Sequence, residues 1–299
     1  MSLLEVDGVS VEYAGGRVRA VDGVSLDVRP GQIVGLVGES GCGKSSLARV
    51  AAGLSAPAAG TVSYRGEPLR ALGWRRRERT GVQMVFQNPY SSLNPRRTVL
   101  SQLLDGVPAG LPDRRGHALK QLSRVGLPEA AARRYPHQFS GGQLQRVAIA
   151  RALAAGPEVI IADEPVTALD VSSQAQVVEV LAELVRELSV GMLFISHDLA
   201  LVHRLADVTA VMYLGRIVES GPTNELWEAP KHPYTRALID AIPALEPDAG
   251  LPRALPGEVA DPGQPPAGCR FRPRCPHAFD RCGTEPALEG ERHRVACFL

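Results

Sequence analysis

Eight consecutive residues of the chain have the types and spacing that suit phosphate binding: residues 38–45 read Gly-Glu-Ser-Gly-Cys-Gly-Lys-Ser. Glycines here let successive backbone N–H groups point at phosphate oxygens, and a following helix adds its positive end. The Lys44 ammonium suits the β- and γ-phosphates, and the Ser45 hydroxyl suits Mg²⁺. We therefore predict a nucleoside triphosphate site with Mg²⁺. Its expected residues are Gly38, Ser40, Gly41, Cys42, Gly43, Lys44, Ser45 and Ser46.

Two carboxylates follow a second apolar run, residues 159–162 (Val-Ile-Ile-Ala). Ligands of open α/β sheets bind at strand ends, so Asp163 and Glu164 are expected beside the phosphate loop. We predict that Asp163 holds the magnesium, directly or through water, and that Glu164 polarises the attacking water. Cys42 is expected only to fill the loop, because nothing in the sequence marks its thiolate as stabilised.

The elements that position these residues alternate between strand and helix. Residues 33–37 are a continuously apolar strand that runs into the phosphate loop, and residues 46–54 have helical character. Further strands are expected at 82–86, 159–162 and 192–195, with a crossover helix at 177–188. Strand, helix, strand in that order implies a parallel sheet covered by helices.

Other segments fall outside this parallel core. Residues 4–30 alternate and are punctuated at Gly15-Gly16 and Asp22-Gly23, which predicts antiparallel strands joined by turns; residues 60–64 add another such stretch. Residues 93–155 have a helical texture, and proline becomes frequent after Pro243. The predicted fold class is α/β, with a P-loop (RecA-like) parallel sheet core, an antiparallel β subdomain, a helical subdomain and an irregular Cys-containing C-terminal extension.

Composition narrows the function classes. The 299 residues carry 33 basic and 32 acidic side chains, so no global field favours nucleic acid or an anionic membrane surface. The amino terminus lacks the pattern of a secretory signal, and charged residues interrupt every apolar run before the roughly 18 residues that a bilayer requires. We expect any membrane association to go through a partner.

A third motif identifies a family. The segment Phe139-Ser140-Gly141-Gly142-Gln143 resembles the Leu-Ser-Gly-Gly-Gln signature of the ATP-binding subunits of ABC transporters, with Phe139 in the place of leucine. Ser140 and the glycine amides at a helix start form a second anion site. Such a chain makes sense as a head-to-tail dimer, in which each signature closes over the ATP of the partner.

The resemblance implies roles for four more residues. Tyr13 matches the aromatic that stacks on adenine, and Gln87 matches the glutamine that senses magnesium and water. Ala168-Leu169-Asp170 resembles the loop between the two sites, and His197 resembles the histidine that contacts the γ-phosphate. The implied organisation is a nucleotide-binding domain over residues 1–240, with its helical subdomain at about 93–155, and an extension over 241–299.

Three further segments resemble the oligopeptide, dipeptide and nickel importer branch of that family: residues 87–95, 134–137 and 232–235. The resemblance implies an ATPase at the cytoplasmic face of the cell membrane. Its implied partners are a sister ATPase in a heterodimer, two permease subunits and an extracytoplasmic binding protein, and no nucleic acid. Oligopeptides or dipeptides are the expected cargo, and nickel or another small solute stays an alternative.

Four cysteines gather near the C-terminus, namely Cys269, Cys275, Cys282 and Cys297. A proline-rich segment with little apolar material requires a cross-link, and a reducing compartment disfavours disulfides. The C-x₂₋₄-C pairs usual for zinc are absent, whereas four spread thiolates can hold a [4Fe–4S] cluster, as in the similar tails of some peptide-importer ATPases. We favour the cluster as a staple of the extension; zinc, free thiols and disulfides stay open.

Two rival functions remain. A non-transport ABC ATPase that acts on ribosomes or DNA would need basic patches, for which Arg75-Arg76-Arg77 and Arg96-Arg97 are the candidates, although short runs are usually solvated. A catalytically dead scaffold is disfavoured, because Glu164, His197 and the signature are all present.

Overall fold

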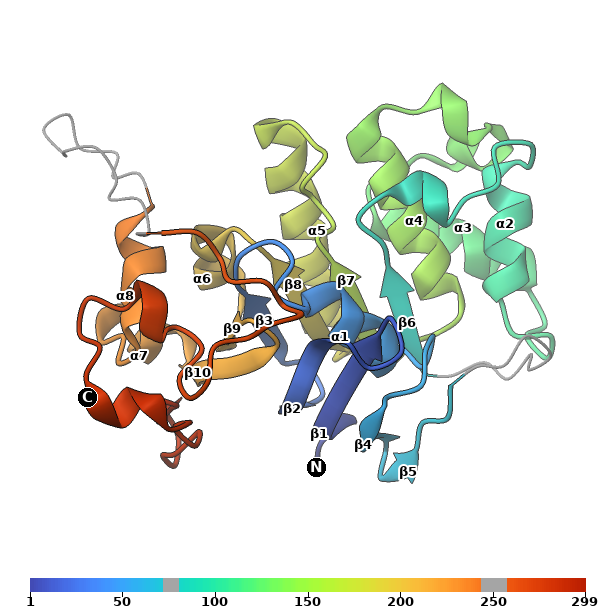
Figure 1. Ribbon diagram of the computed structural model, residues 1–299. Coiled ribbons are helices and arrows are strands. Elements are labelled where there is room, and N and C mark those ends of the chain that lie inside the picture. The colour runs from blue at the N-terminus through green and yellow to red at the C-terminus, as the bar shows by residue number, and fades with distance from the viewer. Residues whose placement is uncertain (72–80, 243–256) are drawn as a thin grey trace, which may run out of the picture.

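The structure is a computed structural model that describes residues 1–71, 81–242 and 257–299 (Figure 1). Two sheets form its frame. One is four-stranded in the order β2-β1-β4-β5, and the other is seven-stranded in the order β11-β10-β9-β3-β8-β7-β6. Arg75-Arg76-Arg77 lie outside the described residues.

The larger sheet has a parallel centre. Strands β3 (Ile33–Val37), β6 (Val82–Val85), β7 (Val159–Asp163), β8 (Gly191–Ser196) and β9 (Val208–Tyr213) run parallel, and every residue of β3, β7 and β8 is buried. Their continuous apolar runs reflect burial on both faces of the sheet. Strands β3, β6, β7 and β8 lie where the sequence predicts them, whereas β9 was not predicted.

The same sheet ends in antiparallel strands that the sequence analysis did not identify. Strand β10 (Arg216–Pro222) pairs with β9 through a tight turn at Leu214 and Gly215, and β11 (Arg294–Val295) pairs with β10. The last strand of the chain therefore belongs to the sheet that carries the phosphate loop.

The smaller sheet is antiparallel and contains β1 (Leu4–Tyr13), β2 (Val18–Val28), β4 (Ala59–Tyr64) and β5 (Glu67–Pro68). The turn expected at Asp22-Gly23 is wrong, because both residues lie inside β2. Val9 pairs with Val24 and Val11 with Val21, so an extra residue of β2 bulges there, which the positive φ of Gly23 (64°) permits.

Three α-helices make up most of the predicted helical region and lie together beyond β6 (Figure 1). They are α2 (Val99–Gly106), α3 (Arg114–Arg124) and α4 (Gly141–Ala154), and the side chains of Thr98, Asp113 and Ser140 accept backbone N–H bonds at their starts. Short 3₁₀ turns interrupt the region at Pro89–Ser91, Glu129–Arg133 and Pro136–Gln138.

The remaining helices cover the sheet. They are α1 (Lys44–Ala51), α5 (Val171–Leu188), α6 (Leu199–Leu205), α7 (Thr223–Glu228) and α8 (Pro233–Asp240). The apolar stripe of α5, with Val177, Leu181, Leu184 and Val185, is buried as the helical spacing predicts. None of the helices in the described ranges is long and apolar enough to cross a bilayer.

The C-terminal extension folds back onto the sheet (Figure 1). It contains two 3₁₀ turns, Arg272–Arg274 and Asp280–Gly283, and ends beyond β11. Phe271, which directly precedes the first turn, is 1% exposed and packs in the same core cluster as Tyr213 of β9 and Tyr234 of α8. The extension is thus packed against β9, β10 and α8.

Candidate nucleotide site

The phosphate loop connects β3 to α1. Gly43 directly precedes α1 at φ 107°, and a Cβ there would lie 2.0 Å from the carbonyl oxygen of Ala20. Only glycine fits, because both the left-handed backbone and the close approach of β2 exclude a side chain. Glycine at position 43 therefore lets the chain turn tightly into α1. The backbone N–H groups at the start of this helix are available to an anion.

Lys44 is held inside this loop. Its side chain is buried, and Nζ donates to the carbonyl oxygens of Gly38 (2.8 Å) and Glu39 (3.0 Å). These bonds keep the ammonium within the curve of the loop that is suited to phosphates. Burial raises the pKa of the neighbouring Cys42 thiol although Lys44 lies close by, which favours the protonated thiol over the reactive thiolate.

The carboxylates after β7 adjoin the loop. Ser45 Oγ donates to Asp163 Oδ1 at 3.0 Å, which joins the two expected magnesium ligands across 118 residues of sequence. Burial raises the pKa of Asp163, and the charge of Glu164 adds to the shift, while the Ser45 hydrogen bond opposes it. A divalent cation at this position would offset the cost of keeping Asp163 ionised.

Glu164 lies at the centre of three polar contacts. Its Oε2 accepts from Gln87 Nε2 (3.2 Å) and Thr167 Oγ1 (3.1 Å), and lies 3.4 Å from His197 Nδ1. Its backbone is left-handed (φ 46°), a conformation that costs a non-glycine residue on the order of 1–3 kcal/mol. The structure thus brings together the three residues expected to be catalytic.

Tyr13 lies at the edge of this site. Its side chain is 46% exposed, and its hydroxyl donates to Ser46 Oγ at 3.2 Å in the first turn of α1. An exposed ring beside the phosphate loop is open to stacking, unlike a tyrosine in the core.

The signature segment is located elsewhere, at the start of α4. Ser140 Oγ accepts from Gln143 N (3.3 Å), and Gln143 Oε1 accepts from Ser140 N (3.2 Å), which is a capping box. Phe139 is buried under the Arg134 guanidinium, 4.3 Å from the ring centre. A Cβ on Gly142 would lie 2.9 Å from Ser173, so α4 and the start of α5 touch without intervening atoms.

Asp170 begins α5 by accepting from Ser173 N at 3.0 Å, and this backbone bond lowers the pKa of Asp170. The expected signature and the expected inter-site loop are therefore in direct contact. Ser140, Gly141 and Asp170 are exposed to solvent.

The four C-terminal cysteines line one small cavity of about 10 Å³, together with His277 and Phe298 among others. All four are free thiols, and burial raises the pKa values of Cys269 and Cys275. Within residues 1–71, 81–242 and 257–299, no three His, Cys, Asp or Glu side chains are disposed to hold a metal ion. The donor set suits a thiolate-bound metal, but the cavity has the size of a single water.

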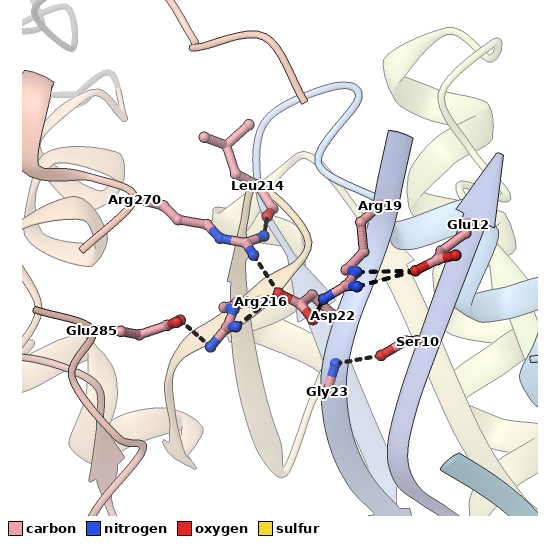
Figure 2. Close-up of polar contacts among 9 residues, drawn as sticks. All are labelled: Ser10, Glu12, Arg19, Asp22, Gly23, Leu214, Arg216, Arg270 and Glu285. Carbon is pink, nitrogen blue, oxygen red and sulfur yellow. Dashed lines mark hydrogen bonds and ion pairs between the residues drawn. The ribbon is translucent and has the colours of Figure 1, made fainter. Parts of the chain in front are cut away.

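The sequence analysis did not predict several residues that contact the phosphate loop or the segments beside it. Glu39 Oε2 pairs with Arg274 Nη1 at 2.7 Å, and the Glu39 N–H donates to the Tyr234 hydroxyl at 2.9 Å. Asp22 pairs with both Arg216 and Arg270 (Figure 2). The only signal in the sequence was an arginine beside each of Cys269 and Cys275.

Comparison with known proteins agrees with this geometry. The ABC transporter family model matches residues 21–167, and the model of the oligopeptide/dipeptide transporter C-terminal region matches residues 218–282. The oligopeptide transport ATP-binding protein OppF of Salmonella typhimurium is 46% identical over 94% of this chain and 87% of its own. The di/tripeptide transport ATP-binding protein DppF of Pseudomonas aeruginosa is 45% identical over 94% and 90%.

Solved structures show the same fold. The protein cbiO1 of Clostridium perfringens, described as part of the ABC transporter complex cbiONQ, has a TM-score of 0.67 at 28% identity, and the match covers 76% of this chain and 91% of cbiO1. The cassette MJ0796, a dimer bound to ADP and Pi, has a TM-score of 0.64 at 29% identity and covers 74% and 98%.

Fold and site together define a P-loop ATPase. The chain belongs to the ABC transporter family, among its ATP-binding proteins.

Proposed function

We propose that this ATPase powers an importer of oligopeptides or dipeptides. The observation that carries the proposal is its similarity, over 94% of its length, to peptide transport ATP-binding proteins. The match of residues 218–282 to the C-terminal region of oligopeptide and dipeptide transporters supports it independently of the ATPase core.

The proposed nucleotide site uses the phosphate loop. Gly38 to Ser46 bind the phosphates of ATP through backbone N–H groups, Lys44 and the hydroxyls, and Tyr13 stacks on the adenine. Ser45, Gln87 and Asp163 would hold Mg²⁺, which would neutralise phosphate charge. Glu164 accepts a proton from the attacking water, while His197 and Gln87 orient Glu164 through the contacts of 3.4 and 3.2 Å.

The exposed signature completes the site of a second subunit. We infer that Ser140 to Gln143 and Asp170 face the ATP of a sister ATPase, because Ser140, Gly141 and Asp170 are exposed and Gly142 of α4 packs against Ser173 at the start of α5. ATP binding then closes a head-to-tail dimer, and hydrolysis reopens it.

Domain division and location follow from the same proposal. Residues 1–240 make the nucleotide-binding domain, which includes the helical subdomain at about 93–155, and residues 241–299 make the extension. The ATPase works with two permease subunits. The assembly includes an extracytoplasmic binding protein, and the ATPase lies at the cytoplasmic face of the membrane.

We further propose that Cys269, Cys275, Cys282 and Cys297 hold a [4Fe–4S] cluster. Their common cavity and free thiols support this donor set. The cluster would staple the extension, and binding it requires the thiols to separate, because the cavity of about 10 Å³ is too small for it.

The proposal is tested by purifying the tagged chain from membranes of the cells that naturally produce it. We expect a second ABC ATPase, two permeases and a binding protein to co-purify, and cells lacking the chain to lose uptake of a labelled tripeptide while retaining uptake of labelled nickel. Loss of nickel uptake alone would replace peptide by metal as the cargo, and co-purification with ribosomes would exclude transport.

A further inference from the structure

The C-terminal extension reaches directly into the phosphate loop. Arg274 Nη1 and Nη2 lie 2.7 and 3.1 Å from the two carboxylate oxygens of Glu39, the second residue of the loop. The Arg274 side chain is 5% exposed and that of Glu39 is 24% exposed, so solvent screens the pair little. A bidentate pair of this kind fixes orientation as well as distance.

Both the side chain and the backbone of Glu39 are held from outside the loop. Its N–H donates to Tyr234 Oη at 2.9 Å, and its carbonyl oxygen accepts from Lys44 Nζ at 3.0 Å. The peptide of Glu39 thus lies between the extension on one side and the phosphate-binding lysine on the other. A shift of Glu39 therefore moves an acceptor of Lys44.

Rigid packing supports Arg274. Tyr213, Tyr234 and Phe271 form an aromatic cluster with ring centres 4.7 to 5.4 Å apart, and Arg274 Nη1 lies 3.4 Å from the Tyr213 hydroxyl. These rings come from β9, α8 and the extension. Arg274 cannot follow Glu39 freely, because its own position is set by buried rings.

A second arginine of the extension supports the loop from its other side. Arg270 donates to the carbonyl oxygen of Leu214 and pairs with Asp22 (Figure 2). The next residue, Gly215, donates its N–H to the carbonyl oxygen of Cys42 in the loop at 2.8 Å. The phosphate loop is thus contacted at Glu39 by Arg274 and at Cys42 by the Leu214–Gly215 turn, to which Arg270 is hydrogen-bonded.

We propose that Arg274 is a positioning residue for ATP binding: it acts through Glu39 to hold the phosphate loop and Lys44 in the geometry that grips phosphate. Arg270 supports the same loop through the Leu214–Gly215 turn. The extension is then a working part of the nucleotide site. The inference concerns the ATP site alone and holds whatever the transporter carries.

A purely structural ion pair would have a different signature. It would attach the extension to the domain, and its loss would lower thermal stability without a specific change in nucleotide affinity. A positioning pair changes the affinity for MgATP in a folded protein.

The test measures the dissociation constant of the full-length chain for MgATP. Arg274→Gln and Glu39→Gln are each expected to weaken MgATP binding about tenfold, because either substitution removes the charge-assisted pair. The double variant should bind no worse than the weaker single variant, and Arg274→Lys should recover part of the affinity because it restores one charge. The melting temperature without nucleotide is recorded for each variant.

Arg292→Gln is the matched control, since Arg292 pairs with Glu225 at 3.4 Å on the exposed side of the same extension and contacts no residue of the loop. Its affinity should equal that of the wild type. MgATP affinity within twofold of wild type in Glu39→Gln overturns the proposal, even if Arg274→Gln does not fold. Additive losses in the double variant also overturn it. Wild-type protein that binds no ATP would instead refute the nucleotide site itself.

Discussion

Glu164 occupies a strained position that its contacts maintain. The left-handed backbone aims the carboxylate at Gln87 and His197, and the Glu164 N–H donates to the Ile195 carbonyl oxygen at 3.0 Å. Strain of this kind persists where the surroundings fix it, and it is common at active sites. In its proposed role as a general base, Glu164 would act through the charge of this carboxylate.

Replacing Glu164→Gln should therefore retain ATP binding and lose hydrolysis by at least about 100-fold, since the amide cannot act as a general base. With its sister subunit and MgATP, the variant should accumulate as a closed dimer in size-exclusion chromatography. Glu179→Gln, on the exposed face of α5, is the control. Unchanged turnover of Glu164→Gln would remove this residue from its proposed role.

His232 provides a pH-dependent contribution to stability. It is buried at the start of α8, where Nδ1 accepts from Tyr234 N at 3.1 Å, and burial lowers its pKa from 6.5 to about 4 although Glu219 opposes the shift. Between these pH values the unfolded chain binds a proton that the folded chain does not. Stability is therefore lost as the pH falls from 6.5 toward 4, by up to about 3 kcal/mol.

The variant His232→Asn should flatten this pH dependence, because asparagine can accept the same backbone bond and does not titrate in this range. Melting temperatures at pH 7.5, 6.0 and 5.0 measure the slope. His137→Asn is the control, since His137 is exposed and its loss should leave the slope unchanged. An equal slope in wild type and His232→Asn would contradict the assignment.

At the scale of elements, α4 and α5 pack closely where the signature meets the start of the helix that Asp170 caps. Gly142 faces Ser173 so closely that a Cβ would lie 2.9 Å from both Cβ and Oγ of the serine. The start of α5 must move to admit a methyl group, since a serine Cβ follows its backbone.

Gly142→Ala should consequently reduce ATPase activity of the assembled dimer about tenfold while changing unfolding free energy by less than about 1 kcal/mol, because alanine favours the helix. The measurement is steady-state ATPase activity beside a denaturation curve. Gly110→Ala, where a Cβ meets no atom within 4 Å, is the control. Full activity in Gly142→Ala would show that this contact does not set the geometry of the site.

Across the whole molecule, the extension joins three parts of the fold. β11 extends the main sheet, Phe271 enters the core, and Arg270 and Arg274 contact the phosphate loop and its supports. Each arginine is the direct neighbour of a cysteine, Cys269 or Cys275. A ligand bound by these thiols would therefore also restrain both arginines.

Anaerobically purified protein should be brown, with broad absorbance near ~400 nm from a thiolate-held iron–sulfur centre. Iron and sulfide analysis measures its stoichiometry. Cys282→Ser should lose the colour, whereas Cys42→Ser should keep it, since Cys42 lies in the phosphate loop. A colourless sample with one zinc per chain would overturn the iron assignment.

The sequence by itself determined the phosphate loop, strands β3, β6, β7 and β8 of the parallel core, the signature motif and the helical region. These features depend on local causes: glycines that permit tight turns, buried runs that form central strands, and caps that begin helices. The bulge at Gly23 and strands β9 to β11 escaped sequence reasoning, because glycine punctuates turns and bulges alike and short strands depend on their neighbours.

Only the tertiary structure decided which distant residues meet. Glu164 joins Gln87 across 77 residues, and Arg274 joins Glu39 across 235, contacts for which no local pattern exists. Such pairs arise when packing of whole elements brings polar groups together out of water, where leaving either group alone would be costly. The residue types of the loop therefore indicate that it binds phosphate, whereas long-range packing determines which residues keep the loop in place.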